Sequence, residues 1–300
     1  MKKFLVFGTP GLVGSRFVDL LAAERQPITP EVHEVDITDK TSLLNFFEKK
    51  NKSFDAVVNF AAITNVDEIE KERGNEKGLA WQVNVEGAAN VADAAKKFDK
   101  FLVHISTDFV FSGSKDNPGP YTEDVKLPED PDEISWYGWT KLMGERKVTE
   151  IGGRVAIVRI SYPYRAHHTQ KMDFARNILS LYDEGKLYPM FTDQIMTPTF
   201  IDEAASVIEE ICELEKSGTF HLASSNATTA YEFASYLLEK ARKVKNVVKK
   251  GSLEEFLKTP GRTPKPARGG LDTRKTQKIL GMKFKTWQQA VDEFVEQVNG

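Results

Sequence analysis

The chain has 300 residues, of which 40% are hydrophobic and 28% are charged, and its formal net charge is -3 at pH 7. This length is enough for one large α/β domain, or for a large domain that carries a smaller one. The charge balance gives no reason to expect a nucleic-acid partner, which requires a basic face, and no stretch approaches the roughly twenty apolar residues that cross a bilayer. The only cysteine, Cys212, cannot form an internal disulfide, so a reducing, cytoplasmic location is expected.

Short apolar runs alternate with helical patterns through the first half of the chain. Strands are expected at residues 4–7, 55–60, 101–106 and 155–160, and helices at residues 13–23, 79–98 and 139–149. This alternation is typical of the α/β class and predicts a doubly wound, parallel Rossmann sheet with a ligand crevice at the carboxyl ends of its strands.

Prolines break the pattern in the second half of the chain. We therefore expect an NAD(P)-binding Rossmann domain over residues 1–162 and a smaller substrate-binding lobe over residues 163–300. Strands and helices of this lobe are expected to return in part to the sheet. Residues 200–202 and 219–222 have the composition of short strands.

Three glycines, Gly8, Gly11 and Gly14, follow the first strand and open the first helix. In this context glycines permit a tight turn, close approach of a diphosphate and close packing of helix on strand. The spacing is Gly-x-x-Gly-x-x-Gly rather than the commoner Gly-x-Gly-x-x-Gly. This loop supplies the cofactor-binding candidates Gly8, Thr9, Pro10, Gly11, Leu12 and Val13.

Further cofactor contacts are expected at later strand ends. Asp36 and Ile37 end an apolar run and are candidates for the adenine edge, and Phe60-Ala61-Ala62 end another strand with small residues that a cofactor can approach. Little room remains for a complete second strand before residue 32, so the acidic residue that usually contacts the adenosine ribose is hard to place. The sequence leaves NAD and NADP open, with NADPH slightly preferred.

A hydroxyl pair and a Tyr/Lys pair indicate carbonyl chemistry. Ser106 and Thr107 end a strand, and Tyr137 and Lys141 lie four residues apart on one face of the next helix. The Lys141 ammonium is expected to lower the pKa of Tyr137 and to hold the nicotinamide ribose. Thr107 or Ser106 is expected to hydrogen-bond a substrate carbonyl oxygen and to stabilise the charge that develops on it.

The Tyr-x-x-x-Lys spacing occurs twice more, at Tyr182/Lys186 and Tyr236/Lys240. Both copies lie beyond the nucleotide-binding half, so we interpret them as ordinary helix residues. Asn84, inside the long helix expected at 79–98, is a poor helix former. We expect Asn84 to support either a backbone kink or a water molecule that relays a proton. The alternative is an ordinary exposed asparagine.

Charged residues of the second half add weaker candidates. Guanidinium groups fit phosphate, so Arg165, Arg176 and Arg268 are candidates for a substrate pyrophosphate, although a surface role is favoured for each. The pair His167-His168 has no accompanying carboxylate or cysteine pattern, so no metal site is expected.

Together these residues resemble the extended short-chain dehydrogenase/reductases, and most closely the dTDP-4-dehydrorhamnose reductase-like group. The matching segments are residues 58–67, 106–111, 137–145, 158–162, 192–199 and 271–272. The resemblance implies that the catalytic residues are Thr107, Tyr137 and Lys141. It implies that Phe60, Ala61, Ala62 and Thr64 line the cofactor and that Val66 and Tyr162 border the sugar pocket. Asn84 and Ser106 complete the cofactor candidates, and Asp108 and Arg268 the substrate candidates.

The activity implied by the resemblance is reduction of a 4-keto group on a nucleotide-linked deoxysugar by NADPH or NADH, in a protein that forms a homodimer. Two alternatives stay open: a nucleotide-sugar epimerase, and a regulatory subunit resembling the β subunit of methionine adenosyltransferase. A dehydratase is disfavoured, because those relatives have Asp-Glu where this chain has Asp108-Phe109. Tyr162 replaces the family's usual tryptophan, and insertions at 71–76 and 129–133 frame the expected substrate pocket. The identity of the sugar therefore stays open.

Overall fold

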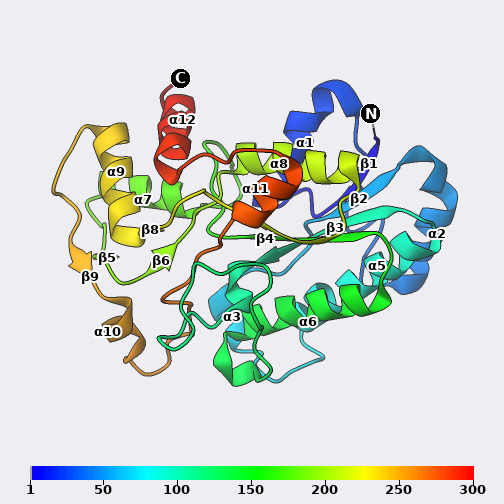
Figure 1. Cartoon of the computed structure of the whole chain (residues 1–300), viewed down its shortest axis with the longest axis horizontal. Coiled ribbons are helices and arrows are strands. Elements are labelled where there is room, and N and C mark those ends of the chain that lie inside the picture. The colour runs from blue at the N-terminus through cyan, green and yellow to red at the C-terminus, as the bar shows by residue number, and fades with distance from the viewer. Residues whose placement is uncertain (1) are drawn as a thin grey trace.

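The computed structural model describes residues 2–300, without the side chains of residues 22–24, and its centre is a five-stranded sheet (Figure 1). All neighbouring strands run parallel. Their spatial order is β1 (Phe4–Phe7), β2 (Ala56–Asn59), β3 (Phe101–Thr107), β4 (Val155–Ile160) and β7 (Gly218–Leu222). The first three strands are buried along their whole length, as continuous apolar runs predict for a sheet covered on both faces.

On the other side of β1 the sheet continues through a single residue, Ile28. The Ile28 amide donates to the Phe4 carbonyl at 2.8 Å, and its carbonyl accepts from the Val6 amide at 2.9 Å. The sequence left little room for a complete second strand after the first helix, and this is confirmed. A parallel bridge of one residue, Ile28 with Leu5, stands where that strand would lie. The chain then crosses to β2 on the opposite side of β1. Strand order therefore reverses at β1, which opens a ligand crevice at its carboxyl end.

Helices cover both faces of this sheet, which confirms the doubly wound prediction (Figure 1). Phe17 and Ile208 belong to the core on one face, and Phe47, Val91 and Val148 to the core on the other. The helices are α1 (Leu12–Arg25) and α8 (Ile201–Leu214) on the first face, and α2 (Lys40–Lys50), α5 (Ala88–Lys97) and α6 (Trp136–Ile151) on the second.

Two expected elements differ in the structure. The helix predicted at 79–98 is composite: α4 (Leu79–Trp81) leads through a π-helical turn (Gln82–Gly87) into α5. The strand predicted at 200–202 is wrong, because Phe200 caps α8 and Ile201 begins it. Buried residues recur at helical spacing along α8, and this longer pattern overrides the short β-like run. The strand predicted at 219–222 is confirmed as β7.

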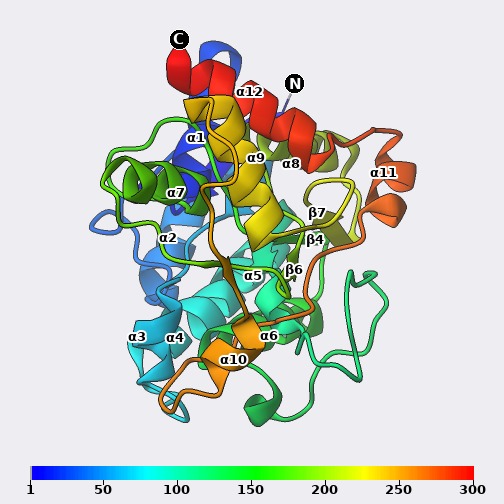
Figure 2. The same cartoon turned by 90° about the vertical axis from the view of Figure 1, so that its left-hand side faces the viewer.

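The second half of the chain builds another core beside the sheet and also adds α8 and β7 to it. In Figure 2, α12 runs across the top of the view and α9 lies beneath it, and both helices contribute residues to this second core. Its helices are α7 (Phe174–Asp183), α9 (Ala230–Arg242) and α12 (Trp287–Asn299). Two small sheets pair β5 (Met190–Phe191) with β9 (Lys250–Gly251) and β6 (Ile195–Met196) with β8 (Thr228–Thr229). The division at residue 162 stays a prediction.

Short elements connect these layers. The remaining helices are α3 (Val66–Glu70), α10 (Leu253–Leu257) and α11 (Arg274–Leu280), and 3-10 turns occur at Asn51–Ser53, Asp108–Val110 and Pro131–Glu133. Over residues 2–300, none of the helices combines the length and the apolar character that a bilayer span requires. Cys212 is buried in α8, as expected, and burial raises the pKa of its thiol, which keeps it unreactive.

Candidate active site

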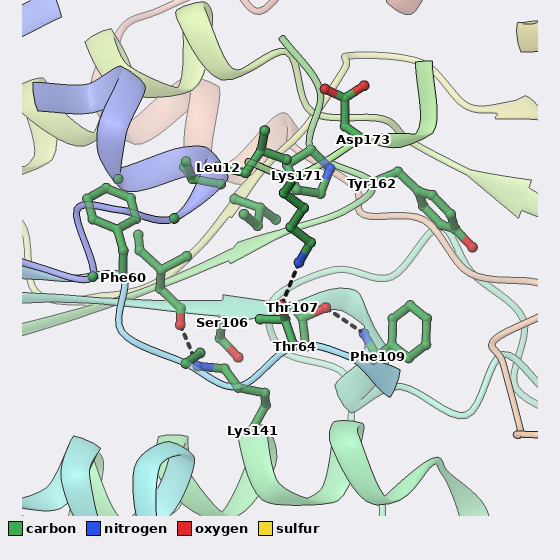
Figure 3. A pocket seen from close by; sticks show the side chains of 18 of the residues that line it. Leu12, Phe60, Thr64, Ser106, Thr107, Phe109, Lys141, Tyr162, Lys171 and Asp173 are labelled. Atoms are coloured by element: carbon green, nitrogen blue, oxygen red, sulfur yellow. Dashed lines mark hydrogen bonds between the residues drawn. The ribbon is translucent and has the colours of Figure 1, made fainter. Parts of the chain in front are cut away.

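A cavity of about 340 Å³ opens at the carboxyl ends of β1, β2, β3 and β4 (Figure 3). Its wall also includes α6 and the loop that precedes α7. The predicted site residues that line it are Gly8, Gly11, Leu12, Val13, Gly14, Phe60, Ala62, Thr64, Val66, Ser106, Thr107, Asp108, Tyr137, Lys141 and Tyr162. The crevice expected at the strand ends is therefore where most of the predicted residues meet.

The glycine loop has the shape of a diphosphate cradle. Gly8 has φ +79°, and a Cβ on it would clash with the backbone of Ala61. A Cβ on Gly14 would clash with the Gly8 carbonyl. Helix α1 begins after Gly11 without a side-chain cap, which leaves its first amides free for an anion.

A buried polar atom also faces this cavity. The Ser106 hydroxyl lines it and has no hydrogen-bond partner among the residues that the structure describes. Buried hydroxyls are normally paired, so this group is available to a ligand. The glycine cradle and the unpaired hydroxyl together fit a dinucleotide that runs from the start of α1 to the end of β3.

Thr107, Tyr137 and Lys141 come together at the end of β3. Thr107 is the last residue of β3, where its hydroxyl accepts from the Phe109 amide at 3.3 Å. Tyr137 and Lys141 lie on α6, which Ser135 caps by accepting from the Gly138 amide at 3.1 Å. The Lys141 ammonium donates to the Ile105 carbonyl at 2.8 Å, and it is fixed beside the strand end (Figure 3).

The protonation of this pair differs from the prediction. Burial, together with the nearby charge of Asp108, raises the pKa of Tyr137 to about 12, although a hydrogen bond with Thr107 offsets part of the rise. Burial also lowers the pKa of Lys141 to about 8. The expectation that Lys141 lowers the pKa of Tyr137 is therefore wrong for this structure. Removal from water outweighs a lysine whose ammonium is engaged by a backbone carbonyl.

A carboxyl group lies beside the trio. Asp108 is buried and accepts from the Ser161 hydroxyl at 2.7 Å. Burial raises its pKa to about 6, against the opposing effects of the hydrogen bonds from Ser161 and Thr107. Tyr162 borders the same space and has a left-handed backbone, with φ +43°. Asp108 and Tyr162 therefore line the cavity together with Thr107 and Tyr137.

Asn84 positions the wall without lining it. Its Oδ1 accepts from the Ile63 amide at 2.9 Å, and its Nδ2 donates to the Ile63 carbonyl and to the Thr140 hydroxyl, both at 3.0 Å. The side chain is fully buried in the π-helical turn, so the exposed alternative is wrong. Asn84 thereby ties the strand-end loop before Thr64 to the helix that carries Tyr137.

The family model described as the RmlD substrate binding domain matches residues 1–299. The chain belongs to this family. It is 28% identical to a dTDP-4-dehydrorhamnose reductase of Aggregatibacter actinomycetemcomitans, over 97% of each chain. It is 31% identical to a probable low-salt glycan biosynthesis reductase (Agl14) of Haloferax volcanii, over 78% of each. A crystal structure of dTDP-4-dehydrorhamnose reductase from Bacillus anthracis in complex with NADP is similar with a TM-score of 0.86, 26% identity and 99% of both chains covered.

Several predicted residues of this RmlD-family chain lie away from the cavity wall. Ile37 is buried in the core against Gly87, and Asp36 turns back to accept from Thr38 at 2.8 Å. Arg268 joins two segments through its backbone, by donating to the Gly113 carbonyl. The predicted candidates outside the wall are Thr9, Pro10, Asp36, Ile37, Ala61, Asn84 and Arg268.

The surface role favoured for Arg165 is wrong. Its guanidinium is buried and donates to the Leu12 carbonyl and to the Ser15 hydroxyl, the latter at 2.8 Å. It therefore holds the start of α1 against the second half of the chain. Arg176 pairs with Asp173 at 2.7 Å and donates to backbone carbonyls of the loop before α7.

The sequence did not point to the loop before α7, although it closes one side of the RmlD-family site. Lys171, Met172, Asp173 and Phe174 line the cavity, and the Lys171 ammonium donates to the Thr64 hydroxyl at 2.7 Å (Figure 3). Asp173 caps α7, an Asp-x-x-Arg signal that could have located the helix start but not the cavity contact. Within residues 2–300 no cluster of three or more His, Cys, Asp or Glu side chains could hold a metal.

Proposed function

We propose that this protein is an NAD(P)H-dependent reductase of a 4-keto group on a nucleotide-linked deoxysugar. The observation that carries the proposal is the meeting of Thr107, Tyr137 and Lys141 in one cavity with a glycine cradle. Similarity over nearly the full chain to proteins named dTDP-4-dehydrorhamnose reductase supports the same reaction.

The cofactor would lie along the glycine loop and the end of β3, and it would supply a hydride to the carbonyl carbon. The free amides at the start of α1 bind its diphosphate, and Phe60, Ala62 and Thr64 line its path. Lys141 and the Ser106 hydroxyl hold its nicotinamide half at the end of β3. These residues would thus hold the nicotinamide half beside Thr107 and Tyr137, the residues proposed to contact the ketone oxygen.

Each member of the trio has a distinct role in this proposal. Thr107, whose hydroxyl donates to Asp108 at 3.3 Å in the structure, would redirect that hydrogen to the ketone oxygen. This bond stabilises the negative charge that arrives with the hydride. Tyr137 then transfers its phenolic proton to that oxygen and completes the alcohol. A pKa of about 12 keeps Tyr137 protonated at neutral pH, and an alkoxide is a stronger base than the resulting phenolate. The raised pKa therefore suits a proton donor.

The sugar nucleotide would occupy the part of the cavity that Asp108 and Tyr162 line. Asp108 and Tyr162 border this space, and Val66 begins α3 at its edge. The contact of Arg268 with the substrate pyrophosphate stays a prediction, since its side chain lies outside the wall. We also propose that the protein works in the cytoplasm as a homodimer; its buried cysteine suits a reducing compartment, and light scattering of the purified protein tests the dimer.

An absorbance assay tests the reaction. Purified protein is mixed with dTDP-4-dehydrorhamnose and NADH or NADPH, and the reduced-nicotinamide band is followed. Loss of absorbance that depends on the ketosugar is the expected result. A cofactor that binds but is never oxidised by any nucleotide-linked 4-ketosugar would contradict the proposal.

A further inference from the structure

The bridge at Ile28 locates the segment that contacts the adenosine ribose. In a doubly wound sheet this ribose lies at the carboxyl end of the strand beside the first one, about twenty residues past the glycines. Ile28 takes the place of that strand, because it pairs with Leu5 of β1. The residues that follow Ile28 and lead to α2 therefore face the ribose position. The sequence alone could not assign this segment.

The charge of this segment is one-sided. Residues 26–39 contain no lysine or arginine, and their acids are Glu31, Glu34, Asp36 and Asp39. Glu31 and Glu34 are exposed in one tight turn, where the Glu34 carboxylate accepts from the Glu31 amide at 2.9 Å. The glycine loop, residues 8–14, carries no basic residue either. The one other ionisable side chain of the segment is His33, whose Nδ1 lies 3.3 Å from the Glu31 carboxylate. A doubly charged phosphate at this end of the site would therefore meet four carboxylates and no lysine or arginine within the segment.

The cations of the flanking elements are already paired with carboxylates. Arg16 of α1 binds Asp202 through two bonds of 2.7 and 2.6 Å. At the end of α1, Arg25 pairs with Glu213, and at the start of α2, Lys40 pairs with Asp93 at 2.8 Å. Arg165, beside the start of α1, lies 3.3 Å from Asp19. Recruiting any of these groups to a ligand phosphate would break an existing ion pair.

We propose that the chain is selective for NAD(H) over NADP(H), with Glu31 as the residue that determines the choice. A carboxylate accepts hydrogen bonds from the ribose hydroxyls of NAD(H) but repels a 2′-phosphate, which an arginine normally binds. This inference rests on the proposed function. It reverses the slight preference for NADPH that the sequence suggested, and it separates this chain from the Bacillus anthracis reductase, whose structure holds NADP.

Binding of NADH and NADPH to the full chain, without any sugar, tests the inference. Dissociation constants are measured by the change in nicotinamide fluorescence. We expect the dissociation constant of NADH to be at least about ten-fold smaller than that of NADPH, because the 2′-phosphate of NADPH would make one unfavourable charge contact with Glu31. Glu31→Lys should remove most of this gap. Glu129→Lys, the same charge change at an exposed site in the 129–133 insertion, should leave the gap unchanged.

Equal or tighter binding of NADPH by the wild-type chain overturns the inference while the reductase proposal stands. A gap that survives in Glu31→Lys overturns the role of Glu31. Failure of both cofactors to bind overturns the proposed function together with the inference. Because these results come from binding alone, none of them depends on choosing the correct ketosugar.

Discussion

Lys171 reaches from the second half of the chain across the cavity to Thr64 and donates to its hydroxyl at 2.7 Å. Its backbone is held in place, because Arg176 donates to the Lys171 carbonyl and pairs with Asp173. Only two lysines and no arginines line the cavity within residues 2–300, and the other lysine, Lys141, is engaged beside β3. Partial burial lowers the pKa of Lys171, as it does for an ammonium without a carboxylate partner.

Lys171→Met should therefore weaken the binding of a nucleoside diphosphate such as dTDP. We expect a loss of about ten-fold in affinity, the usual scale for one charge-assisted bond, with little change in the unfolding free energy. Isothermal titration calorimetry measures the affinity. Lys171→Arg should recover much of it, whereas Lys216→Met, at an exposed site in the turn after α8, is the control. Unchanged dTDP affinity in Lys171→Met would rule out this role.

Tyr137→Phe should abolish the proton transfer while preserving the cofactor site. The expected loss in kcat is about 10²–10⁴-fold, because a positioned proton donor contributes on that scale. Cofactor affinity, measured by fluorescence, should stay within about two-fold, since the phenolic oxygen adds at most one neutral hydrogen bond. Tyr236→Phe is the matched control, because Tyr236 belongs to another Tyr-x-x-x-Lys pair. Its hydroxyl donates to Asp292, and the residue lies outside the cavity. Full activity of Tyr137→Phe would contradict the proposed proton donor.

Turnover should decline as the pH rises through about 8. Burial places the pKa of Lys141 near that value, so its ammonium is lost in this range and no longer holds the nicotinamide ribose. The measurement is kcat against pH at saturating ketosugar and cofactor. Unfolding monitored in parallel separates this decline from loss of structure. A profile that stays flat well above pH 8 would show that the Lys141 charge is not required.

Asp108 should make the protein less stable at neutral pH than in mild acid. Its native pKa of about 6 lies above the ordinary value of 3.8. The protonated group therefore contributes its stability fully below pH 3.8, and this contribution is lost as the pH rises through about 6. The cost at neutral pH is roughly 3 kcal/mol.

Urea unfolding of wild type and Asp108→Asn at low and neutral pH measures this cost. The variant cannot ionise, so its stability relative to wild type should increase by roughly 2.4 kcal/mol between pH about 4, where the unfolded carboxyl is already partly ionised, and pH about 7.5. Asp124→Asn, at an exposed carboxylate that pairs with Lys275, is the control and should show a much smaller change. Parallel pH curves for wild type and Asp108→Asn would disprove the assigned burial cost.

Asn84→Ala should destabilise the protein and loosen the active site. The substitution removes the bonds to both backbone groups of Ile63 and to Thr140, and it leaves buried polar atoms without partners. We expect a loss of about 2–4 kcal/mol in the unfolding free energy, measured by urea denaturation. Asn51→Ala removes one exposed bond to the Glu48 carbonyl and should cost far less. Similar losses in both variants would show that the π-helical turn needs no side-chain support.

The sequence predicted the parts of the fold that depend on local pattern. Continuous apolar runs located β1, β2, β3 and β4, and the glycines after β1 indicated the cradle at the start of α1. The strand predicted at 200–202 was wrong because these three residues alone resemble a strand. The helix that begins there is recognised only from the buried positions that follow. Element type is therefore predicted best where the pattern is long.

The rest of the site depends on contacts between distant residues. The bond from Lys171 to Thr64 joins positions 107 apart in the chain, and no local signal marks it. The pKa of Tyr137 depends on how fully the assembled fold removes it from water, which the spacing to Lys141 does not reveal. The ribose segment became assignable only when Ile28 was found beside β1.

Transfer of deuterium from cofactor to sugar tests the central claim most directly. The protein is mixed with dTDP-4-dehydrorhamnose and reduced nicotinamide cofactor that carries deuterium at the transferable position, and the sugar product is analysed by mass spectrometry and NMR. A 4-ketoreductase predicts one deuterium on carbon 4 of the product and an equal amount of oxidised cofactor, both lost in Tyr137→Phe. A sugar product without deuterium, or one formed without net oxidation of the cofactor, would contradict the account.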